Sequence, residues 1–156
     1  MIEMTIPGRG NIQINSLVLD VNGTIAQDGT LLPGVVEKLR LLMDRVNICM
    51  ITSNTYSRQN NIDLQLGIRA QIIQKENEIN QKKEFIIKLN SENVIAIGNG
   101  ANDVGMFEAA AIGICVLSPE GTSVKALMTA DIVVPDILTA LELIENPLRL
   151  VATLRQ

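Results

Sequence analysis

Apolar and polar residues alternate in blocks along most of the chain. Short apolar runs bounded by polar residues or glycine predict buried β-strands over residues 14–19, 46–51, 70–73, 94–97, 111–117 and 131–134. Longer segments with apolar residues at helical spacing predict helices over residues 33–43, 57–66, 81–89 and 123–130, and over a C-terminal stretch divided by Pro147. Strands that alternate with helices predict an α/β fold, in which a parallel sheet with right-handed crossovers is flanked by helices.

Two segments interrupt this alternation with turn signals. Residues 1–6 and 11–14 flank the turn Pro7-Gly8-Arg9-Gly10, which predicts an N-terminal β-hairpin. Residues 25–31 contain an Asp-Gly turn signal, and we expect a small second hairpin there, hanging over the end of the first sheet strand as a flap. No linker or repeat divides the chain, so we expect a single domain over residues 1–156.

The composition predicts a folded protein with an aliphatic core and limits its chemistry. Hydrophobic residues make up 47% of the chain, yet the only aromatic residues are Tyr56, Phe85 and Phe107. The absence of histidine excludes Ser-His-Asp triads, Cys-His pairs and His-ligated zinc. Cys49 and Cys115 each lie inside an apolar run, which is typical of small buried side chains, and two cysteines do not make a disulfide scaffold.

Charge and hydropathy indicate which partners to expect. The net charge is −4, from 13 Lys and Arg against 17 Asp and Glu, and this balance argues against a nucleic-acid partner. No apolar run is long enough to span a bilayer and no signal-peptide pattern is present, so we expect a cytoplasmic protein that does not contact membranes. The apolar stretch 138–154 favours packing on the protein's own sheet, and the pattern leaves a homo-oligomer open.

Polar side chains gather where the predicted strands end. Asp20 closes the first sheet strand, and Gly23 then allows a sharp turn that we expect to expose backbone N–H groups to a phosphate. Further polar groups occur at Thr52-Ser53-Asn54, Lys82-Lys83 and Asn99 to Asp103. The carboxyl ends of parallel strands meet at one edge of a sheet, so these groups should converge. Each alone is typical of a helix cap or a solvated surface, but together they suit Mg²⁺-assisted phosphoryl transfer.

On these residues the chain resembles the haloacid dehalogenase-like superfamily, and in particular its small soluble members related to the phosphorylation domain of P-type ATPases. The matching motifs are Asp20-Val21-Asn22-Gly23-Thr24, a strand ending in Thr52, Lys82 with Phe85 three positions on, and Gly98-Asn99-Gly100-Ala101-Asn102-Asp103. The resemblance covers nearly the whole chain. It implies a three-layer, Rossmann-like fold and a phosphohydrolase that acts through an aspartyl-phosphate.

The resemblance also implies a role for each matching residue. Asp20 would be the nucleophile, and Thr52 and Lys82 would contact the phosphoryl group, with Lys83 as the alternative lysine. The expected phosphate-binding residues are Gly23, Thr24, Ser53, Asn54 and Asn102. The expected ligands of Mg²⁺ are Asp20, the backbone carbonyl of Asn22, Asn99 and Asp103.

Two asparagines depart from the family's pattern. Most phosphatases of this family carry an acid where this chain has Asn22, and that acid protonates the leaving group and then activates water. An amide cannot exchange a proton at neutral pH, and general acid–base help is typically worth ~10²–10⁴-fold in rate. We therefore expect a slow phosphatase, or one whose phospho-Asp20 persists. Asn99 replaces the first acid of the fourth motif and offers Mg²⁺ an uncharged oxygen, which predicts lower metal affinity.

The spacing of the motifs leaves no room for the large cap domain found in many members of the superfamily. About thirty residues separate Asp20 from Thr52, and about thirty separate Thr52 from Lys82, which the predicted helices and strands consume. An open site would admit a phosphorylated small molecule or macromolecule. Ion pumping is excluded, because the membrane helices and nucleotide-binding insert of P-type ATPases are missing.

Two other functions compete with the phosphatase. One is a catalytically degenerate relative that binds a phospho-ligand or partner without efficient turnover. Asn22 and Asn99, which replace acids of the family pattern, are the residues that support this alternative. The other is a phosphoryl-acceptor switch like a receiver domain, which the Asp-x-Asn-Gly-Thr sequence and the late Asn102-Asp103 pair fit poorly.

Overall fold

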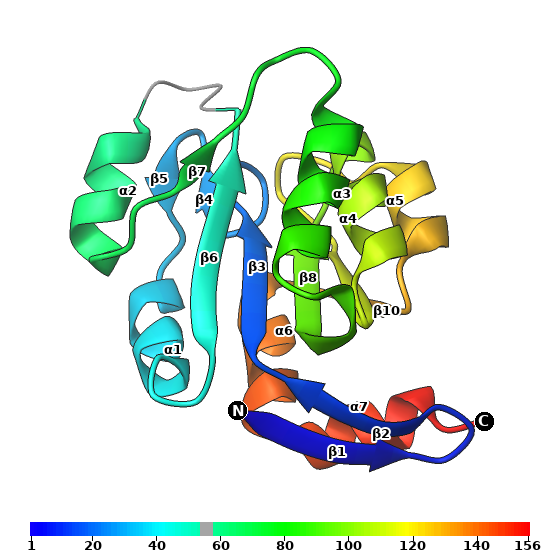
Figure 1. Cartoon of the computed structure of the whole chain (residues 1–156). Coiled ribbons are helices and arrows are strands. Elements are labelled where there is room, and N and C mark those ends of the chain that lie inside the picture. Colours follow the sequence, from blue (N-terminus) through cyan, green and yellow to red (C-terminus); the bar gives the residue numbers. More distant parts are fainter. Residues whose placement is uncertain (54–57) are drawn as a thin grey trace.

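A parallel β-sheet forms the centre of the protein, as the computed structural model of residues 1–53 and 58–156 shows (Figure 1). In this described part of the chain the sheet has six strands in the order β10-β9-β8-β3-β6-β7. The strands are β3 (Ser16–Asp20), β6 (Asn47–Thr52), β7 (Gln71–Ile72), β8 (Val94–Gly98), β9 (Ile112–Val116) and β10 (Ile132–Val134). All neighbouring pairs are parallel, which confirms the predicted fold class.

Helices cover both faces of the sheet and give the three layers. The helices α1 (Val35–Leu42), α2 (Gln59–Leu66) and α6 (Ile137–Glu145) pack into the core on one face. The opposite face is covered by α3 (Glu78–Lys88), α4 (Val104–Ala109) and α5 (Val124–Thr129). Successive residues of the central strand β3 alternate between the two cores, with Leu17 and Leu19 in the first and Val18 in the second. Burial on both faces explains why this strand is a continuous apolar run.

The N-terminal hairpin lies at the end of the sheet away from the strands' carboxyl ends. Its strands β1 (Ile2–Ile6) and β2 (Gly10–Ile14) are antiparallel, and β1 packs beside α7 (Pro147–Leu154) (Figure 1). Pro147 begins α7 at the position where its missing N–H group costs nothing, so the predicted division of the C-terminal stretch is confirmed. Helix α6 buries its apolar side in the protein's own core.

The second predicted hairpin is also present, and it follows the central strand directly. Its strands are β4 (Ala26–Gln27) and β5 (Thr30–Leu31). Two hydrogen bonds hold the tip of this hairpin. The N–H group of Asp28 donates to Glu120 (3.2 Å), and the carbonyl of Asp28 accepts a bond from Arg58 (3.4 Å). This short hairpin is the only insertion between Asp20 and α1, so no large cap lies there.

Several element boundaries differ from the sequence-based expectation by one to three residues; for example, β3 begins at Ser16 instead of residue 14, and α1 begins at Val35 instead of residue 33. Strand β7 has two residues instead of four, and α3 begins at Glu78 instead of Gln81. Asn77, with a φ of 58°, precedes the extra turn of α3. That turn lies close against α4, since a Cβ atom on Gly105 would be 2.3 Å from the carbonyl oxygen of Ile79. Such packing between distant segments leaves no periodic signal in a polar stretch.

The connections between strands and helices complete the chain. Two short 3-10 turns, η1 (Ser91–Asn93) and η2 (Ala101–Asp103), precede β8 and α4. No helix in residues 1–53 or 58–156 is long and apolar enough to cross a membrane.

Candidate active site

Asp20 lies at the carboxyl end of the central strand, where three strands bring polar residues together. Its backbone is in register with Ile51 of β6, so Thr52 is the next residue along on that side. On the other side β8 ends at Gly98 and Asn99 follows. Asp20 is 6% exposed and Thr52 is 1% exposed. The predicted convergence of polar groups at this edge of the sheet is therefore present.

A buried lysine connects two carboxylates at the centre of this group. The Nζ atom of Lys82 lies 2.6 Å from Oδ1 of Asp20 and 2.6 Å from Oδ1 of Asp103. Lys82 is 1% exposed and comes from α3, whereas Asp103 comes from η2. The sequence favoured Lys82, from its spacing to Phe85, and left Lys83 as the alternative. Lys83 points to the surface, where it forms an exposed ion pair with Glu108 (3.3 Å), so Lys82 is the lysine at the site.

The charges of this cluster act on one another strongly because they are buried. The pKa of Asp20 is raised to about 7, first by burial and then by the charge of Asp103, while Lys82 and Thr24 oppose the shift. Burial lowers the pKa of Lys82, but Asp103 and Asp20 outweigh this, and the net shift is upward. One cation facing two carboxylates leaves excess negative charge in a dry space, and such a space favours a further cation.

Asp103 holds together the loop that follows β8. Its Oδ2 atom accepts hydrogen bonds from the N–H groups of Asn99 and Gly100, both at 2.8 Å. Its approach requires glycine at position 98, because a Cβ atom there would lie 2.4 Å from Oδ2. Asp103 is fully buried and accepts three hydrogen bonds, one at Oδ1 and two at Oδ2, and the metal-ligand role expected for it stays a prediction.

A single hydroxyl group faces two oxygen atoms of the predicted metal ligands. The Oγ1 atom of Thr24 lies 3.2 Å from Oδ2 of Asp20 and 3.0 Å from Oδ1 of Asn99. A hydroxyl has one hydrogen, so it cannot donate fully to both. Gly23, with a φ of 82°, lets Asn99 approach, since a Cβ atom there would be 2.6 Å from Asn99 Nδ2. The Asn99 amide also donates to the carbonyl of Gly121 (2.9 Å).

These oxygens fit a hard divalent cation with few charged ligands. Mg²⁺ takes oxygen ligands and keeps several waters, so two protein side chains and a carbonyl suffice to hold it. Asp20 Oδ2 and Asn99 Oδ1 both lie within hydrogen-bond distance of the Thr24 hydroxyl, so a cation bound between them could take both oxygens as ligands. Among the described residues no three acidic, cysteine or histidine side chains cluster to bind a metal without such help. The site therefore fits Mg²⁺, with the Asp20 carboxylate as a charged ligand.

The turn after Asp20 differs in one respect from the sequence-based expectation. The N–H group of Gly23 donates to Ala26 (2.8 Å) and that of Thr24 donates to Val21 (3.2 Å). These two groups close the turn, so they are not the exposed phosphate donors that the glycine pattern predicts. The reason is that the β4–β5 hairpin begins at once and its first carbonyl needs a donor.

The remaining predicted residues lie around this centre. The Nδ2 atom of Asn22 donates to the Thr52 hydroxyl (3.3 Å), which links the first and second motifs. Ser53 follows Thr52 and is half-buried. Asn54 lies outside the described residues. The phosphate-binding roles of Ser53, Asn54 and Asn102 stay predictions.

Glu78 is a residue that the sequence reasoning missed. Its Oε2 atom accepts a bond from Nδ2 of Asn102 (2.5 Å), next to Asp103 in the same turn. Glu78 and Lys82 are four residues apart on α3 and therefore share a helix face. They bind the consecutive residues Asn102 and Asp103, so α3 is fixed at two points. The four-residue spacing of Glu78 and Lys82 would have placed both on one face of α3 if the polar residues before Gln81 had been assigned to that helix.

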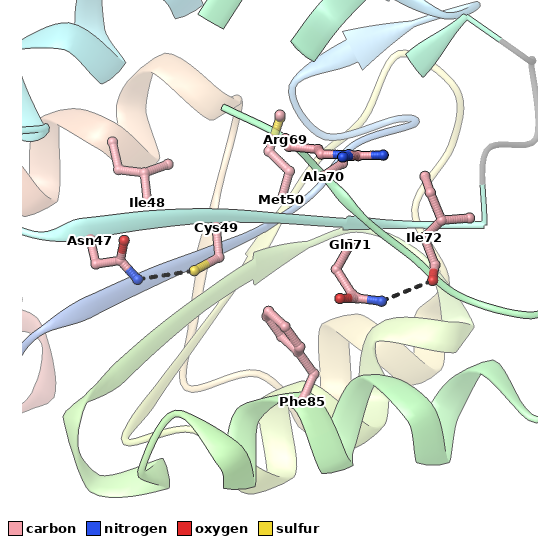
Figure 2. A pocket seen from close by; sticks show the side chains of 9 residues that line it. All are labelled: Asn47, Ile48, Cys49, Met50, Arg69, Ala70, Gln71, Ile72 and Phe85. Carbon is pink, nitrogen blue, oxygen red and sulfur yellow. Dashed lines mark hydrogen bonds between the residues drawn. The ribbon is translucent and has the colours of Figure 1, made fainter. Parts of the chain in front are cut away.

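A hollow elsewhere on the molecule lacks this chemistry. Figure 2 shows this hollow of about 570 Å³, lined by β6, β7 and Phe85 of α3. Figure 2 marks two hydrogen bonds among its lining residues, from Asn47 to the half-buried Cys49 and from Gln71 to the carbonyl of Ile72. Among the described residues that line it there is no acid and no member of the Asp20 cluster.

Comparison with known proteins assigns the chain to a family. The model of the haloacid dehalogenase-like hydrolases matches residues 37–130, more than half of the chain. An uncharacterized protein from Methanocaldococcus jannaschii is 45% identical over 78 residues, which are 47% of this chain and 84% of that protein. The chain therefore belongs to the haloacid dehalogenase-like hydrolase family, as its motifs predicted.

Solved structures show the same fold at low sequence identity. A haloacid dehalogenase superfamily (subfamily III A) hydrolase from Legionella pneumophila has a TM-score of 0.68 and 18% identity, over 90% of this chain and 87% of that chain. The 3-deoxy-D-manno-octulosonate 8-phosphate phosphatase from Moraxella catarrhalis, solved with magnesium and phosphate ions and the sugar, has a TM-score of 0.63 and 20% identity. That alignment covers 91% of this chain and 94% of the phosphatase.

Replacing Lys82 with methionine should destabilise the protein in a pH-dependent way. Loss of the cation leaves Asp20 and Asp103 as unpaired buried charges, which costs about 3–5 kcal/mol of unfolding free energy at pH 8. Lys82 lowers the pKa of Asp20, so its loss raises that pKa above the already raised wild-type value, and Asp20 takes up a proton as the pH falls, which relieves the repulsion. The deficit should therefore be smaller at pH 5. Urea unfolding at both pH values measures it.

The matched control is Lys83→Met on the same helix. Lys83 forms only an exposed ion pair, so its loss should change the unfolding free energy by less than about 1 kcal/mol at either pH. Equal effects of the two substitutions would contradict the buried three-charge cluster.

Proposed function

We propose that this protein is a Mg²⁺-dependent phosphohydrolase that forms an aspartyl-phosphate on Asp20. The observation that supports this most is the position of Asp20 at the end of the central strand, with the Lys82 ammonium 2.6 Å from one carboxylate oxygen. A carboxylate held there can attack an electrophile that sits beyond the sheet edge. Membership of a hydrolase family agrees with that role, although the match to the family model covers residues 37–130 and begins after Asp20.

In the first step, the phosphoryl group is transferred to Asp20, and each residue of the site has a separate role. A carboxylate oxygen of Asp20 attacks phosphorus, and the bond from phosphorus to the leaving oxygen breaks. Lys82 offsets the charge of Asp20 and of the incoming phosphate, and Asp103 fixes Lys82 and the loop after β8. The Thr52 hydroxyl lies beside Asn22 at the same edge, where it can contact a phosphate oxygen. Mg²⁺ held by Asp20, the Asn22 carbonyl and Asn99 would supply positive charge to the phosphate oxygens.

The second step returns the enzyme to its starting state. Water attacks phosphorus of the acyl phosphate, inorganic phosphate leaves, and the Asp20 carboxylate is restored. Asn22 cannot donate a proton to the leaving oxygen or take one from water, so both must be exchanged with solvent. The amide of Asn22 instead donates to Thr52. We therefore propose a slow enzyme whose phospho-Asp20 is comparatively long-lived.

Phosphate release from p-nitrophenyl phosphate tests the proposed activity. The wild type should release phosphate with Mg²⁺ and stop when EDTA removes the metal, whereas Asp20→Asn should be inactive because an amide is not a nucleophile here. Phosphate release by Asp20→Asn at the wild-type rate would refute the role of this carboxylate. Binding without release by the wild type would favour the degenerate, ligand-binding alternative.

Asn22→Asp should make the enzyme faster. The new carboxyl can protonate the leaving oxygen and then activate water, and we expect a gain of about 10²-fold in turnover number, the low end of the usual range for such help. Steady-state kinetics with a phosphomonoester at saturating Mg²⁺ measure it. An unchanged or lower turnover number would mean that the missing acid does not limit this enzyme.

Asn99→Asp should tighten metal binding. A second carboxylate beside Asp20 Oδ2 adds a charged ligand, and we expect the Mg²⁺ concentration that gives half the maximal rate to fall by about tenfold. Loss of the bond to Gly121 works against this gain but does not involve the metal. Asn146→Asp, at the start of α7, adds the same charge far from the site and serves as the control. If both variants respond alike, Asn99 is not a ligand.

A further inference from the structure

The outer strand of the N-terminal hairpin has an open edge. Strand β1 pairs with β2 on one side, and no strand within residues 1–53 or 58–156 pairs with its other side. In Figure 1 the hairpin lies below the central sheet, and β1 is the strand farther from that sheet. Helix α7 packs against β1, but a helix does not supply the backbone bonds that the edge of a strand lacks. A further strand can therefore be added at this edge.

The backbone of β1 directs two residues to the open edge. The carbonyl of Ile6 accepts a bond from the N–H group of Arg9 (2.9 Å), so the backbone groups of Ile6 point to the side of β2. Bonded and non-bonded pairs alternate along an antiparallel ladder, so Glu3 and Thr5 point their N–H and C=O groups the other way. The side chains of Glu3 and Thr5 are exposed as well, on a strand whose other side chains are buried.

We propose that this edge is a dimer interface, in which the β1 strands of two copies of the chain pair antiparallel about a two-fold axis at Met4. The rotation places Glu3 of each copy opposite Thr5 of the other, so every outward N–H and C=O group of these two residues finds a partner. Two-fold symmetry requires a surface that is complementary to itself. Asp20 lies at the opposite end of the central sheet, so both candidate sites stay open and the inference does not depend on the proposed function.

The sequence of β1 selects this register over its neighbours. With the axis at Met4, each Glu3 carboxylate faces a neutral hydroxyl group. An axis at Glu3 would place two carboxylates directly opposite each other, which is destabilising. An axis at Thr5 would pair Glu3 with Pro7, which has no N–H group and whose carbonyl already accepts a bond from Gln156 (3.0 Å). This match of the edge with itself is the reason to assign it to a second copy of the chain.

The two faces of the combined sheet also continue those of the hairpin. On the exposed face the Thr5 hydroxyl donates to Asn11 (2.7 Å) and the Gln13 amide donates to Glu3 (3.1 Å). The apolar side chains of β1 lie on the other face, in the core that α7 also enters. Pairing keeps polar residues on one face and brings the two Met4 side chains together on the other. Joining the hairpins also widens a two-stranded sheet, which is a marginally stable unit by itself.

Multi-angle light scattering over a dilution series tests the interface. The wild type should approach twice the 17.0 kDa mass of one chain as the concentration rises. Thr5→Pro removes an N–H group that the β1–β2 ladder does not use, so the hairpin should still form. The dissociation constant of the dimer should then rise by at least about tenfold. A wild type that stays monomeric at every concentration would overturn the inference.

Thr5→Val is the matched control at the same position. Valine keeps the N–H group and the β-branched shape but loses the hydroxyl bond to Asn11, as proline does. This variant should dimerise like the wild type. Equal weakening by the two substitutions would overturn the inference, because the outward backbone group would then not be responsible.

Leu148→Ser tests the competing apolar surface. Leu148 lies on α7, beside β1, and is 82% exposed. Its substitution should leave the dissociation constant of the dimer unchanged. Loss of the dimer in this variant, with Thr5→Pro unaffected, would overturn the inference and place the contact on α7.

Cysteine cross-linking reads the register without relying on the proline variant. A mixture of Glu3→Cys and Thr5→Cys proteins should form a disulfide-linked dimer on mild oxidation, because residues opposite each other in a bonded pair lie about 5.5 Å apart, within the range of a disulfide. Neither variant alone should cross-link above the wild type, which carries the same native Cys49 and Cys115. Equal cross-linking of either variant alone would show a different register and overturn the inference.

Discussion

The site depends on one buried ammonium group placed between two carboxylates. Without Lys82, Asp20 and Asp103 would carry two like charges in a space almost closed to water; even with Lys82 present, burial and Asp103 raise the pKa of Asp20 to about 7. Lys82 reaches this position because α3 packs closely on α4, where Gly105 leaves room for the backbone of Ile79. Glu78 adds a second contact one turn earlier. The packing of the layer formed by α3, α4 and α5 therefore also determines the electrostatics of the site. The contact that positions α3 places the positive charge of Lys82 beside the proposed nucleophile, Asp20.

Glycines make a second contribution that is purely steric. Gly98 admits the carboxylate of Asp103 and Gly23 admits the amide of Asn99, each to a distance that no side chain would permit. These contacts draw the loops after β3 and β8 together over the sheet edge. The result is a cluster in which the Thr24 hydroxyl lies between an oxygen atom of the Asp20 carboxylate and the amide oxygen of Asn99. This arrangement explains why a metal fits the site although the described residues contain no cluster of three acidic ligands.

Much of this could be predicted from the sequence, because the sheet is central and its strands are short apolar runs. The strand that ends at Asp20, both hairpins and the break at Pro147 follow from local pattern and turn chemistry. The spacing to Phe85 favoured Lys82 over Lys83 only moderately, since the choice depends on which helix face meets η2. The first turn of α3 was missed because its polar residues are stabilised by contacts with α4, and Glu78 was missed with it. The backbone donors of Gly23 and Thr24 were assigned to a phosphate because the pattern does not show that the β4–β5 hairpin uses them.

The central claim is that Asp20 becomes covalently phosphorylated and that the missing acid at position 22 lets the intermediate accumulate. The most direct measurement is to quench the wild type in acid during turnover of a phosphomonoester with Mg²⁺, and then to map the added mass by peptide analysis. We predict one phosphoryl group on the peptide that contains Asp20, a smaller steady-state amount in Asn22→Asp and none in Asp20→Asn. Phosphate release by the wild type without any label on that peptide, or a label on a different residue, would contradict it.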